Sequence, residues 1–260
     1  MRPRLTKYQV IVITTILATV LISVITDGAT CFWWLAGLCS LAGTAVGLGV
    51  SFPQMQMFGR SICLAPTRRK VVALTFDDGP DPVNTPALLD LLAERKVRAT
   101  FFCIGTRVLA QPELMNRLVA AEHEIENHTF RHSPATNIFS VRQLRDELSR
   151  TQSAIEQTTG RLPEYFRPPM GLTSPRTFRV AAEFELKITG YTARGLDRRD
   201  DTPEIIVGRL LRKLQPGAIF LLHDAGVPRE RMVTVVTLLL DKLAAEGYQC
   251  LRLDELMTTT

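Results

Sequence analysis

The 260-residue chain lacks the features that mark several common classes of protein. Its five cysteines are scattered and odd in number, so we interpret them as small buried side chains and not as a disulfide framework. The formal net charge is +5, yet the sequence has no basic run beyond Arg68-Arg69-Lys70. Internal repeats and low-complexity segments are also missing. Nucleic-acid binding and a repeat architecture are therefore not expected.

Two long apolar stretches without charge stand at the beginning of the chain. They run from Tyr8 to Thr26 and from Cys31 to Val50, and Asp27-Gly28 separates them. Each is close to the roughly 20 residues that a helix needs to cross a bilayer. The second opens with Phe32-Trp33-Trp34, which is typical of a membrane interface. We predict a transmembrane helical hairpin over residues 1–52 and a juxtamembrane linker over residues 53–70.

A cleaved signal peptide and a buried soluble hairpin are the two alternatives to membrane spans. The first stretch follows basic residues, as a cleaved signal peptide does, but no small-x-small cleavage site comes after it. A buried hairpin of a soluble protein would need a polar face, and neither stretch has one. We therefore expect a two-span anchor in the cell membrane.

The basic residues beside the spans predict an orientation. Arg2, Arg4 and Lys7 precede the first span, basic residues follow the second, and the connecting turn carries only Asp27. Because basic residues favour the cytoplasmic side, both ends of the hairpin and the domain that follows are predicted to be cytoplasmic. The cluster Arg68-Arg69-Lys70 is expected to lie against anionic membrane lipid.

The remaining chain carries a split set of acidic residues and histidines. Thr75-Phe76-Asp77-Asp78-Gly79-Pro80 follows a short apolar run, and three of the four histidines occur as His128, His132 and His223. An isolated pair of histidines four residues apart is usually unrelated to metal, and adjacent aspartates before a glycine are common turn formers. Carboxylates at the end of a buried strand lie where α/β folds place their chemistry, however. The combination predicts a mononuclear metal site that activates water.

At these residues the chain resembles a known family. The segment from about Arg69 to Met257 is similar to the polysaccharide deacetylases of carbohydrate esterase family 4, the NodB-homology domain, so we expect such a domain over residues 71–260. The resemblance rests on five motifs in the family's order, namely TFDDGP, His128-Thr129-x-x-His132, Arg167-Pro168-Pro169, Asp197-Arg198-Arg199-Asp200 and Leu222-His223-Asp224.

The resemblance implies a role for each motif residue. Asp78, His128 and His132 would hold a divalent metal, usually zinc. Asp77 would be the general base that takes a proton from the attacking water, and Arg167 would orient it. His223 would be the general acid that protonates the leaving amine, and Asp197 would hold it. The residues expected to contact the sugar are Pro169, Met170, Gly171 and Leu222, with the backbone N–H of Met170 as an oxyanion donor.

The chain departs from the family pattern at three positions. Met170 replaces the aromatic residue that usually ends the third motif, and Asp201 replaces a tryptophan in the fourth. Glu126 stands where a small residue is common. These changes leave the catalytic set complete but alter the expected walls of the substrate groove, so a long polymer is not assumed as substrate.

The pattern after Val71 alternates short apolar strands with helical segments. About seven strands predict an α/β fold, a distorted (β/α) barrel of parallel strands, and the resemblance implies the same. One strand is expected over Leu186 to Thr192, where it would deliver Asp197. The fourth histidine, His123, is interpreted as a turn residue.

Three functions follow as hypotheses. The first is a membrane-anchored, metal-dependent deacetylase that hydrolyses the N-acetyl group of an amino sugar in a polysaccharide or oligosaccharide. The second is a deacylase or deformylase of an undecaprenyl-linked sugar at the cytoplasmic membrane face. The third is a non-catalytic, membrane-bound sugar-binding protein, which the retention of all the metal ligands, the acid and the base disfavours.

Overall fold

A computed structural model describes residues 5–259, so Arg2 and Arg4, on which the predicted orientation partly depends, lie outside the described residues. The elements are α1 (Lys7–Ile25), α2 (Gly28–Ser51), η1 (Pro53–Met55), β1 (Val71–Asp77), α3 (Asn84–Glu94), β2 (Thr100–Cys103), α4 (Gly105–Ala110), α5 (Pro112–Ala120), β3 (Glu124–Asn127), η2 (Thr136–Ile138), α6 (Val141–Thr159), β4 (Tyr165–Phe166), η3 (Pro169–Gly171), α7 (Pro175–Glu183), β5 (Lys187–Ile188), β6 (Ala193–Arg194), α8 (Pro203–Leu211), β7 (Ala218–His223), α9 (Arg229–Ala245), β8 (Gln249–Leu251) and α10 (Leu253–Thr258).

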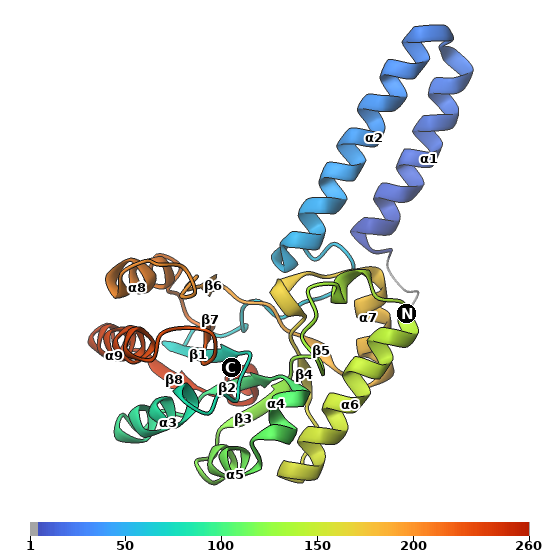
Figure 1. Cartoon of the computed structure of the whole chain (residues 1–260). Coiled ribbons are helices and arrows are strands. Elements are labelled where there is room, and N and C mark those ends of the chain that lie inside the picture. Colours follow the sequence, from blue (N-terminus) through green and yellow to red (C-terminus); the bar gives the residue numbers. More distant parts are fainter. Residues whose placement is uncertain (1–4, 260) are drawn as a thin grey trace.

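The helices α1 and α2 form a hairpin that projects from the rest of the molecule (Figure 1). Both are long and apolar enough to cross a bilayer, and their apolar side chains are exposed instead of packed in a core. Thr6 caps α1 through a reciprocal pair of contacts with Gln9. The base of the hairpin contacts the domain, because the backbone N–H of Tyr8 donates to the carbonyl of Met57 at 3.0 Å.

The sheet is a curled half-barrel of parallel strands in the order β5-β4-β3-β2-β1-β7-β6, with β8 paired to the start of β1. This confirms the predicted α/β class and the parallel strands. The strands at the two ends, β5 and β6, are not paired with each other in the described chain, so the barrel stays open between them. Residues of the expected linker lie in this gap, where Ile62 bridges Thr189 and Leu64 bridges Ala218.

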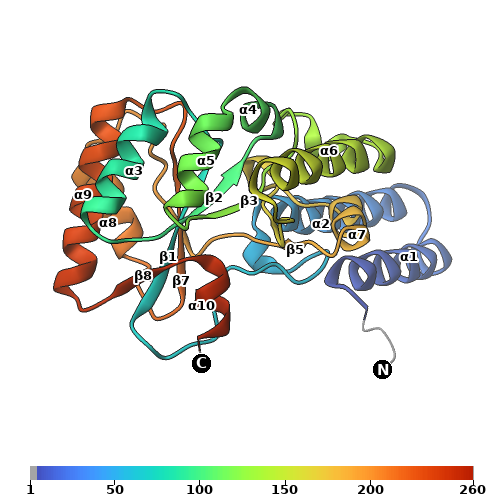
Figure 2. The ribbon, with the colours of Figure 1, turned by 90° about the horizontal axis from the view of Figure 1, so that it is seen from below.

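Side chains of the central strands alternate between two hydrophobic layers. In β1, Val72, Leu74 and Phe76 pack with the helices that cover the outer face, α3, α5, α8 and α9 (Figure 2). Val71 and Ala73 face the inside of the half-barrel instead. This period of two is the geometry of a strand, and it places Asp77 on the inward side at the end of β1.

Of the strand expected over Leu186 to Thr192, only Lys187 and Ile188 form a strand, β5, and a separate strand, β6, begins just after the expected range. β5 pairs with β4 at one end of the sheet, whereas β6 pairs with β7 at the other, and β6 precedes Asp197. The chain crosses the open side between them, where the N–H of Thr192 donates to the carbonyl of Ile219 at 2.8 Å. The apolar pattern of the sequence does not reveal this change, because β5 and β6 pair with different strands and both partners lie far away in sequence.

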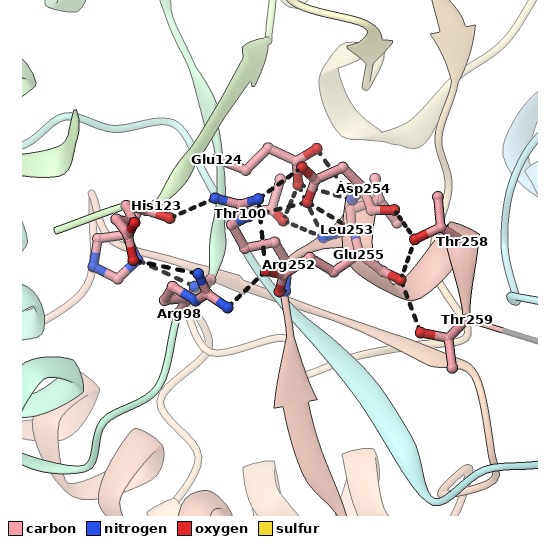
Figure 3. A network of polar contacts seen from close by, with 12 residues as sticks. Arg98, Thr100, His123, Glu124, Arg252, Leu253, Asp254, Glu255, Thr258 and Thr259 are labelled. Atoms are coloured by element: carbon pink, nitrogen blue, oxygen red, sulfur yellow. Dashed lines mark hydrogen bonds and ion pairs between the residues drawn. The ribbon is translucent and has the colours of Figure 1, made fainter. Parts of the chain in front are cut away.

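Buried polar groups close the end of the half-barrel at which β2 and β3 begin (Figure 3). Oε2 of Glu124 accepts hydrogen bonds from the hydroxyl of Thr100 at 2.6 Å and from the N–H of Leu253 at 2.9 Å, so the carboxylate caps α10. Burial raises the pKa of Glu124 to about 7. Neither α4 nor α10 was expected from the sequence, because both helices are a turn or two long.

His123 is a buried residue at this same end, which corrects its interpretation as a turn residue. Its Nδ1 accepts the backbone N–H of Ala99 at 3.1 Å, and its ring meets the edge of Phe101 with the centroids 5.2 Å apart. Burial lowers the pKa of His123 to about 4, which keeps Nδ1 free to accept. The histidine holds β2 beside β3 and takes no part in the metal motif.

Candidate active site and metal centre

The predicted base Asp77, the predicted acid His223 and the three predicted metal ligands line one pocket at the carboxyl ends of the strands, and Arg167 and Asp197 lie behind the first two. Asp77 ends β1, His223 ends β7, and the loop after β3 carries both predicted metal-binding histidines. The pocket has a volume of about 240 Å³. Its lining residues are Asp77, Asp78, His128, His132, Met170, Gly171, Tyr191, Arg194, Leu196, Arg198, Leu221 and His223.

The predicted metal ligands lie close enough to share one ion. Nε2 of His128 and Nε2 of His132 are each 3.1 Å from Oδ1 of Asp78, and the three ligand atoms lie within 4.8 Å of one another. A tetrahedral zinc ion with bonds of 2.0–2.1 Å separates its ligand atoms by about 3.3 Å. Oδ1 of Asp78 is buried without a hydrogen-bond partner in the described chain, as a carboxylate oxygen reserved for a cation would be. The donor set therefore fits zinc.

The tautomer of His128 also suits a metal ligand. Its Nδ1 lies 2.7 Å from the carbonyl oxygen of Arg167, which can only accept, so the ring proton belongs on Nδ1. When the ring is neutral, the lone pair of Nε2 is then available to a metal ion. A second ring nitrogen held by a backbone carbonyl is the usual support of a metal-binding histidine.

Several influences act on the carboxyl group of Asp78. Burial would raise its pKa, but the close imidazole nitrogen of His128 and the charges of His132 and Arg198 outweigh burial and hold the pKa well below its usual range. Asp78 is therefore a carboxylate at neutral pH. Arg198 contacts its Oδ2 and leaves Oδ1 to the histidine side.

Helix α6 holds the loop that carries the two histidines. Thr129 and His132 both have positive φ angles, 65° and 50°, so the backbone between them needs support. The buried carboxylate of Glu147 accepts the N–H of Phe130 at 3.0 Å and the N–H of Arg131 at 2.8 Å. This anchoring turns both metal-binding histidines toward the same point.

A second buried carboxylate supports the turn of the first motif. Asp224 accepts the hydroxyl of Thr85 at 2.6 Å and lies directly beneath Gly79, where a Cβ atom would come within 2.1 Å of its Oδ2. Burial raises the pKa of Asp224 to about 7. Only glycine fits at Gly79, and the packing fixes the backbone that follows Asp77 and Asp78.

Asp77 is held by a buried guanidinium group. Nη1 of Arg167 donates to Oδ1 of Asp77 at 2.6 Å and to the hydroxyl of Thr75 at 2.7 Å, and Nη2 donates to the carbonyl of Gly190 at 2.8 Å. The guanidinium also lies over the ring of Phe102, 4.1 Å from its centroid. Oδ2 of Asp77 stays free toward the pocket, 4.0 Å from Nε2 of His128.

His223 is oriented by Asp197, as expected. Nδ1 of His223 is 2.8 Å from Oδ1 of Asp197, and the other carboxylate oxygen accepts the backbone N–H of His223 at 2.8 Å. Burial would lower the pKa of His223, but the hydrogen bond and charge of Asp197 raise it above its ordinary value. Nε2 is thus left to face the pocket, on a ring that binds its proton more tightly than a free imidazole.

Met170 occupies a turn with left-handed backbone. Its φ angle is 58° and that of Gly171 is 70°. Neighbouring N–H groups bond within the turn, as Gly171 does to Pro168, whereas the N–H of Met170 donates to no acceptor among the described residues. Pro169 is buried beneath the turn and does not line the pocket.

Leu222 corrects a prediction about the substrate-binding residues. It is 2% exposed and packs in the outer hydrophobic layer, whereas Leu221 lines the pocket. The physical reason is strand alternation in β7, which turns Leu221 and His223 to the same face and Leu222 to the other. The same alternation, counted back from His223, would have selected Leu221 from the sequence.

Two further expectations about the groove walls differ from the structure. Glu126 is buried and does not line the pocket, because its Oε2 accepts the N–H of Tyr165 at 2.6 Å. Asp201 adds no free negative charge, because Nη2 of Arg209 pairs with it at 2.7 Å.

Five pocket residues had no predicted role in the site, namely Tyr191, Arg194, Leu196, Arg198 and Leu221. Tyr191 lies on the chain segment that crosses to β6, and Arg194 ends β6. Neither of these two belongs to one of the five motifs, and the expected strand over Leu186 to Thr192 ended before Arg194. A sequence signal for them would have required knowing that the chain changes partners between β5 and β6.

Comparison with known proteins identifies relatives for most of the chain. The polysaccharide deacetylase family model matches residues 65–189. The peptidoglycan-N-acetylglucosamine deacetylase of Bacillus cereus is 35% identical over 194 residues, which cover 74% of this chain and 90% of that protein. A chitooligosaccharide deacetylase of Bradyrhizobium is 35% identical over 190 residues, which cover 68% of this chain and 86% of that protein.

Solved structures share the fold. A family 4 acetyl xylan esterase from Clostridium thermocellum, in complex with a cobalt ion, has a TM-score of 0.67 and 34% identity, with coverage of 73% of this chain and 91% of that one. A pseudoenzyme of carbohydrate esterase family 4 from Bacillus anthracis has a TM-score of 0.70 and 27% identity, with coverage of 76% and 68%.

Fold, pocket and relatives together define a hydrolase of non-peptide carbon–nitrogen bonds. The chain belongs to the polysaccharide deacetylase family, carbohydrate esterase family 4.

Proposed function

We propose that this protein is a metal-dependent deacetylase that removes the N-acetyl group of an amino sugar in a polysaccharide or oligosaccharide. The observation that carries the proposal is the meeting of Asp78, His128 and His132 in one pocket with Asp77 and His223. The relatives named for deacetylation of peptidoglycan and chitooligosaccharide support the substrate class.

The metal site would be formed by Asp78, His128 and His132, with zinc as the expected ion. When bound there, a divalent cation supplies Lewis acidity and lowers the pKa of water to about 7. The unpartnered Oδ1 of Asp78 and the Nδ1 proton of His128 are the features of this chain that support metal binding.

The chain's own residues divide the proton transfers between two sides of the pocket. Asp77, which Arg167 orients, takes the proton of the attacking water through its free Oδ2. The N–H of Met170 is available to the oxyanion that forms from the amide carbonyl. His223, whose pKa Asp197 raises, gives a proton from Nε2 to the leaving amine.

The test is release of acetate from a panel of N-acetylated substrates by purified, zinc-loaded protein. We expect acetate from chitooligosaccharides or peptidoglycan fragments, and we expect His128→Ala to lose both bound zinc and activity. Unchanged zinc in His128→Ala would overturn the ligand assignment. A fully zinc-loaded protein that frees no acid from any substrate would instead support the non-catalytic alternative.

A second candidate is a deacylase or deformylase of an undecaprenyl-linked sugar, and one observation favours it. The wall of the pocket is bonded to the base of the hairpin, because the N–H of Thr173 donates to the carbonyl of Val50 at 3.1 Å and Nε2 of Gln54 donates to the carbonyl of Tyr191 at 2.8 Å. If α2 spans the membrane, the pocket lies close to the lipid surface. Faster acyl release from a lipid-linked sugar than from its lipid-free form would support this candidate.

The membrane arrangement is part of the proposal. A hairpin over residues 1–52 would anchor the protein, residues 53–70 would join it to the sheet, and residues 71–260 would form the deacetylase domain. The charge bias around the hairpin supports a cytoplasmic domain, where carbohydrate and membrane lipid would be its partners.

A further inference from the structure

We propose that the pocket selects amino sugars that carry an anionic group, phosphate or carboxylate, and that Arg194 is the residue that recognises it. This inference rests on the proposed deacetylase function and specifies its substrate class. Arg194 is exposed at the end of β6, lines the catalytic pocket, and is one of two arginines there.

Arg194 has no acidic partner among the described residues, unlike the other charged groups at the site. Asp77 pairs with Arg167, Asp78 contacts Arg198, and Asp197 pairs with His223. The guanidinium carbon of Arg194 instead lies 5.8 Å from the centroid of the Tyr191 ring. A cation inside a pocket whose carboxylates are already paired is available to a ligand.

The charge of the pocket points the same way. Arg167 pairs with Asp77 and Arg198 with Asp78, so these two arginines already balance the carboxylates of the first motif, and Arg194 adds a further positive charge to the pocket. A divalent cation at the metal site and a protonated His223 would make the sum clearly positive. The positive electrostatic potential of such a pocket attracts negatively charged substrates, whereas a neutral sugar gains nothing from it.

The chemistry of guanidinium narrows the class of ligand. Its fixed fork of N–H donors matches the oxygens of a phosphate or a carboxylate in a bidentate contact. A phosphate could come from a lipid carrier or from a soluble sugar phosphate, and a carboxylate from an acidic sugar. All three present the same oxygens to Arg194, and the assay distinguishes them.

The experiment measures kcat/KM for acyl release on four substrates. These are a neutral N-acetylated oligosaccharide, the same oligosaccharide with a terminal phosphate, one with a carboxylate-bearing sugar, and the phosphate form joined to a lipid in detergent micelles. Wild-type full-length protein is compared with Arg194→Gln, with Arg194→Lys, and with Arg212→Gln, which removes an exposed positive charge just after α8 and serves as the matched control.

We expect the ratio of kcat/KM for an anionic over the neutral substrate to fall about tenfold in Arg194→Gln, which corresponds to about 1.4 kcal/mol. The loss should lie in KM, added salt should reduce the wild-type ratio, and Arg194→Lys should restore part of it. Arg212→Gln should keep the wild-type ratio.

The outcomes separate the two proposals. An unchanged ratio in Arg194→Gln, with good turnover of all substrates, would overturn the role of Arg194 and leave the deacetylase function standing. No turnover of any substrate by zinc-loaded wild-type protein would overturn the deacetylase function itself. A ratio that falls only for the lipid-linked substrate would assign the anion to the lipid carrier.

Discussion

At the scale of single residues, the side chains proposed to react or to bind metal differ from the side chains that position them. Asp77 and Asp78 are neighbours in sequence, yet Arg167 takes an oxygen of the first and Arg198 an oxygen of the second. The remaining oxygens differ in their surroundings: Oδ2 of Asp77 faces the pocket, and Oδ1 of Asp78 lies beside the two histidines predicted to bind metal. The two aspartates should therefore respond differently to substitution.

Asp77→Asn should lower kcat by about 10²- to 10⁴-fold, because the amide cannot take a proton from water. Metal content measured by elemental analysis should stay near that of the wild type, since Asp77 is not among the predicted ligands. Asp90→Asn, which alters an exposed carboxylate, is the matched control. Activity retained in Asp77→Asn would rule out the assigned base.

Asp197→Asn should move the alkaline limb of the pH profile of kcat/KM to lower pH. The catalytic form of His223 is protonated, and Asp197 outweighs burial and raises the pKa of His223, so the wild-type enzyme keeps this proton to a higher pH. Without the carboxylate the proton is lost sooner as pH rises. An alkaline limb that does not move would assign it to another group.

Among the helices, strands and loops, buried polar side chains orient the loops that carry the site. Glu147 on α6 receives backbone N–H groups of the second motif, and Asp224 supports the turn of the first. Both contacts are made by side chains and are not part of the backbone hydrogen bonding of a helix or a sheet. The loops thus depend on helices and strands that are distant in sequence.

Glu147→Ala should lower the free energy of unfolding by about 1–3 kcal/mol, because it leaves buried N–H groups of Phe130 and Arg131 without an acceptor. It should also weaken zinc binding in a chelator competition, since the loop carries His128 and His132. Glu156→Ala removes an exposed carboxylate from the same helix and serves as the control. Equal loss of stability in both variants would contradict the anchoring role.

At the scale of the whole molecule, the hairpin packs against the segment that leads into the half-barrel, in addition to being linked to it through the polypeptide chain. Gly49 near the end of α2 lies against Met57, where a Cβ atom would come within 2.5 Å of the methionine side chain. The chain after Met57 then enters the open side of the sheet. The hairpin therefore packs directly against the segment that leads into the sheet.

The full-length protein should remain in the membrane fraction after washing at high salt and alkaline pH, and detergent should release it, because two apolar helices hold it. A reporter fused to the C-terminus should be active in the cytoplasm. Release by salt alone would argue against spanning helices. Reporter activity on the outer side would reverse the proposed orientation.

The sequence was enough to select a candidate catalytic set, because compact motifs at the ends of strands carry it. The TFDDGP turn, the paired histidines and His223 needed only their spacing and order. Arg194 was missed because its place at the pocket depends on the pairing of β6 with β7, whereas Leu221 could have been selected by counting back from His223.

Local spacing and composition are enough to predict the family, the apolar hairpin, the alternation of strands and helices, and the metal-ligand set. Four other features emerge only when the chain is folded: the barrel stays open, Ile62 and Leu64 of the expected linker bridge to residues beside the opening, Glu126 lies away from the pocket, and Arg194 lines it. These features depend on pairing between segments far apart along the chain, and no local pattern encodes such pairing.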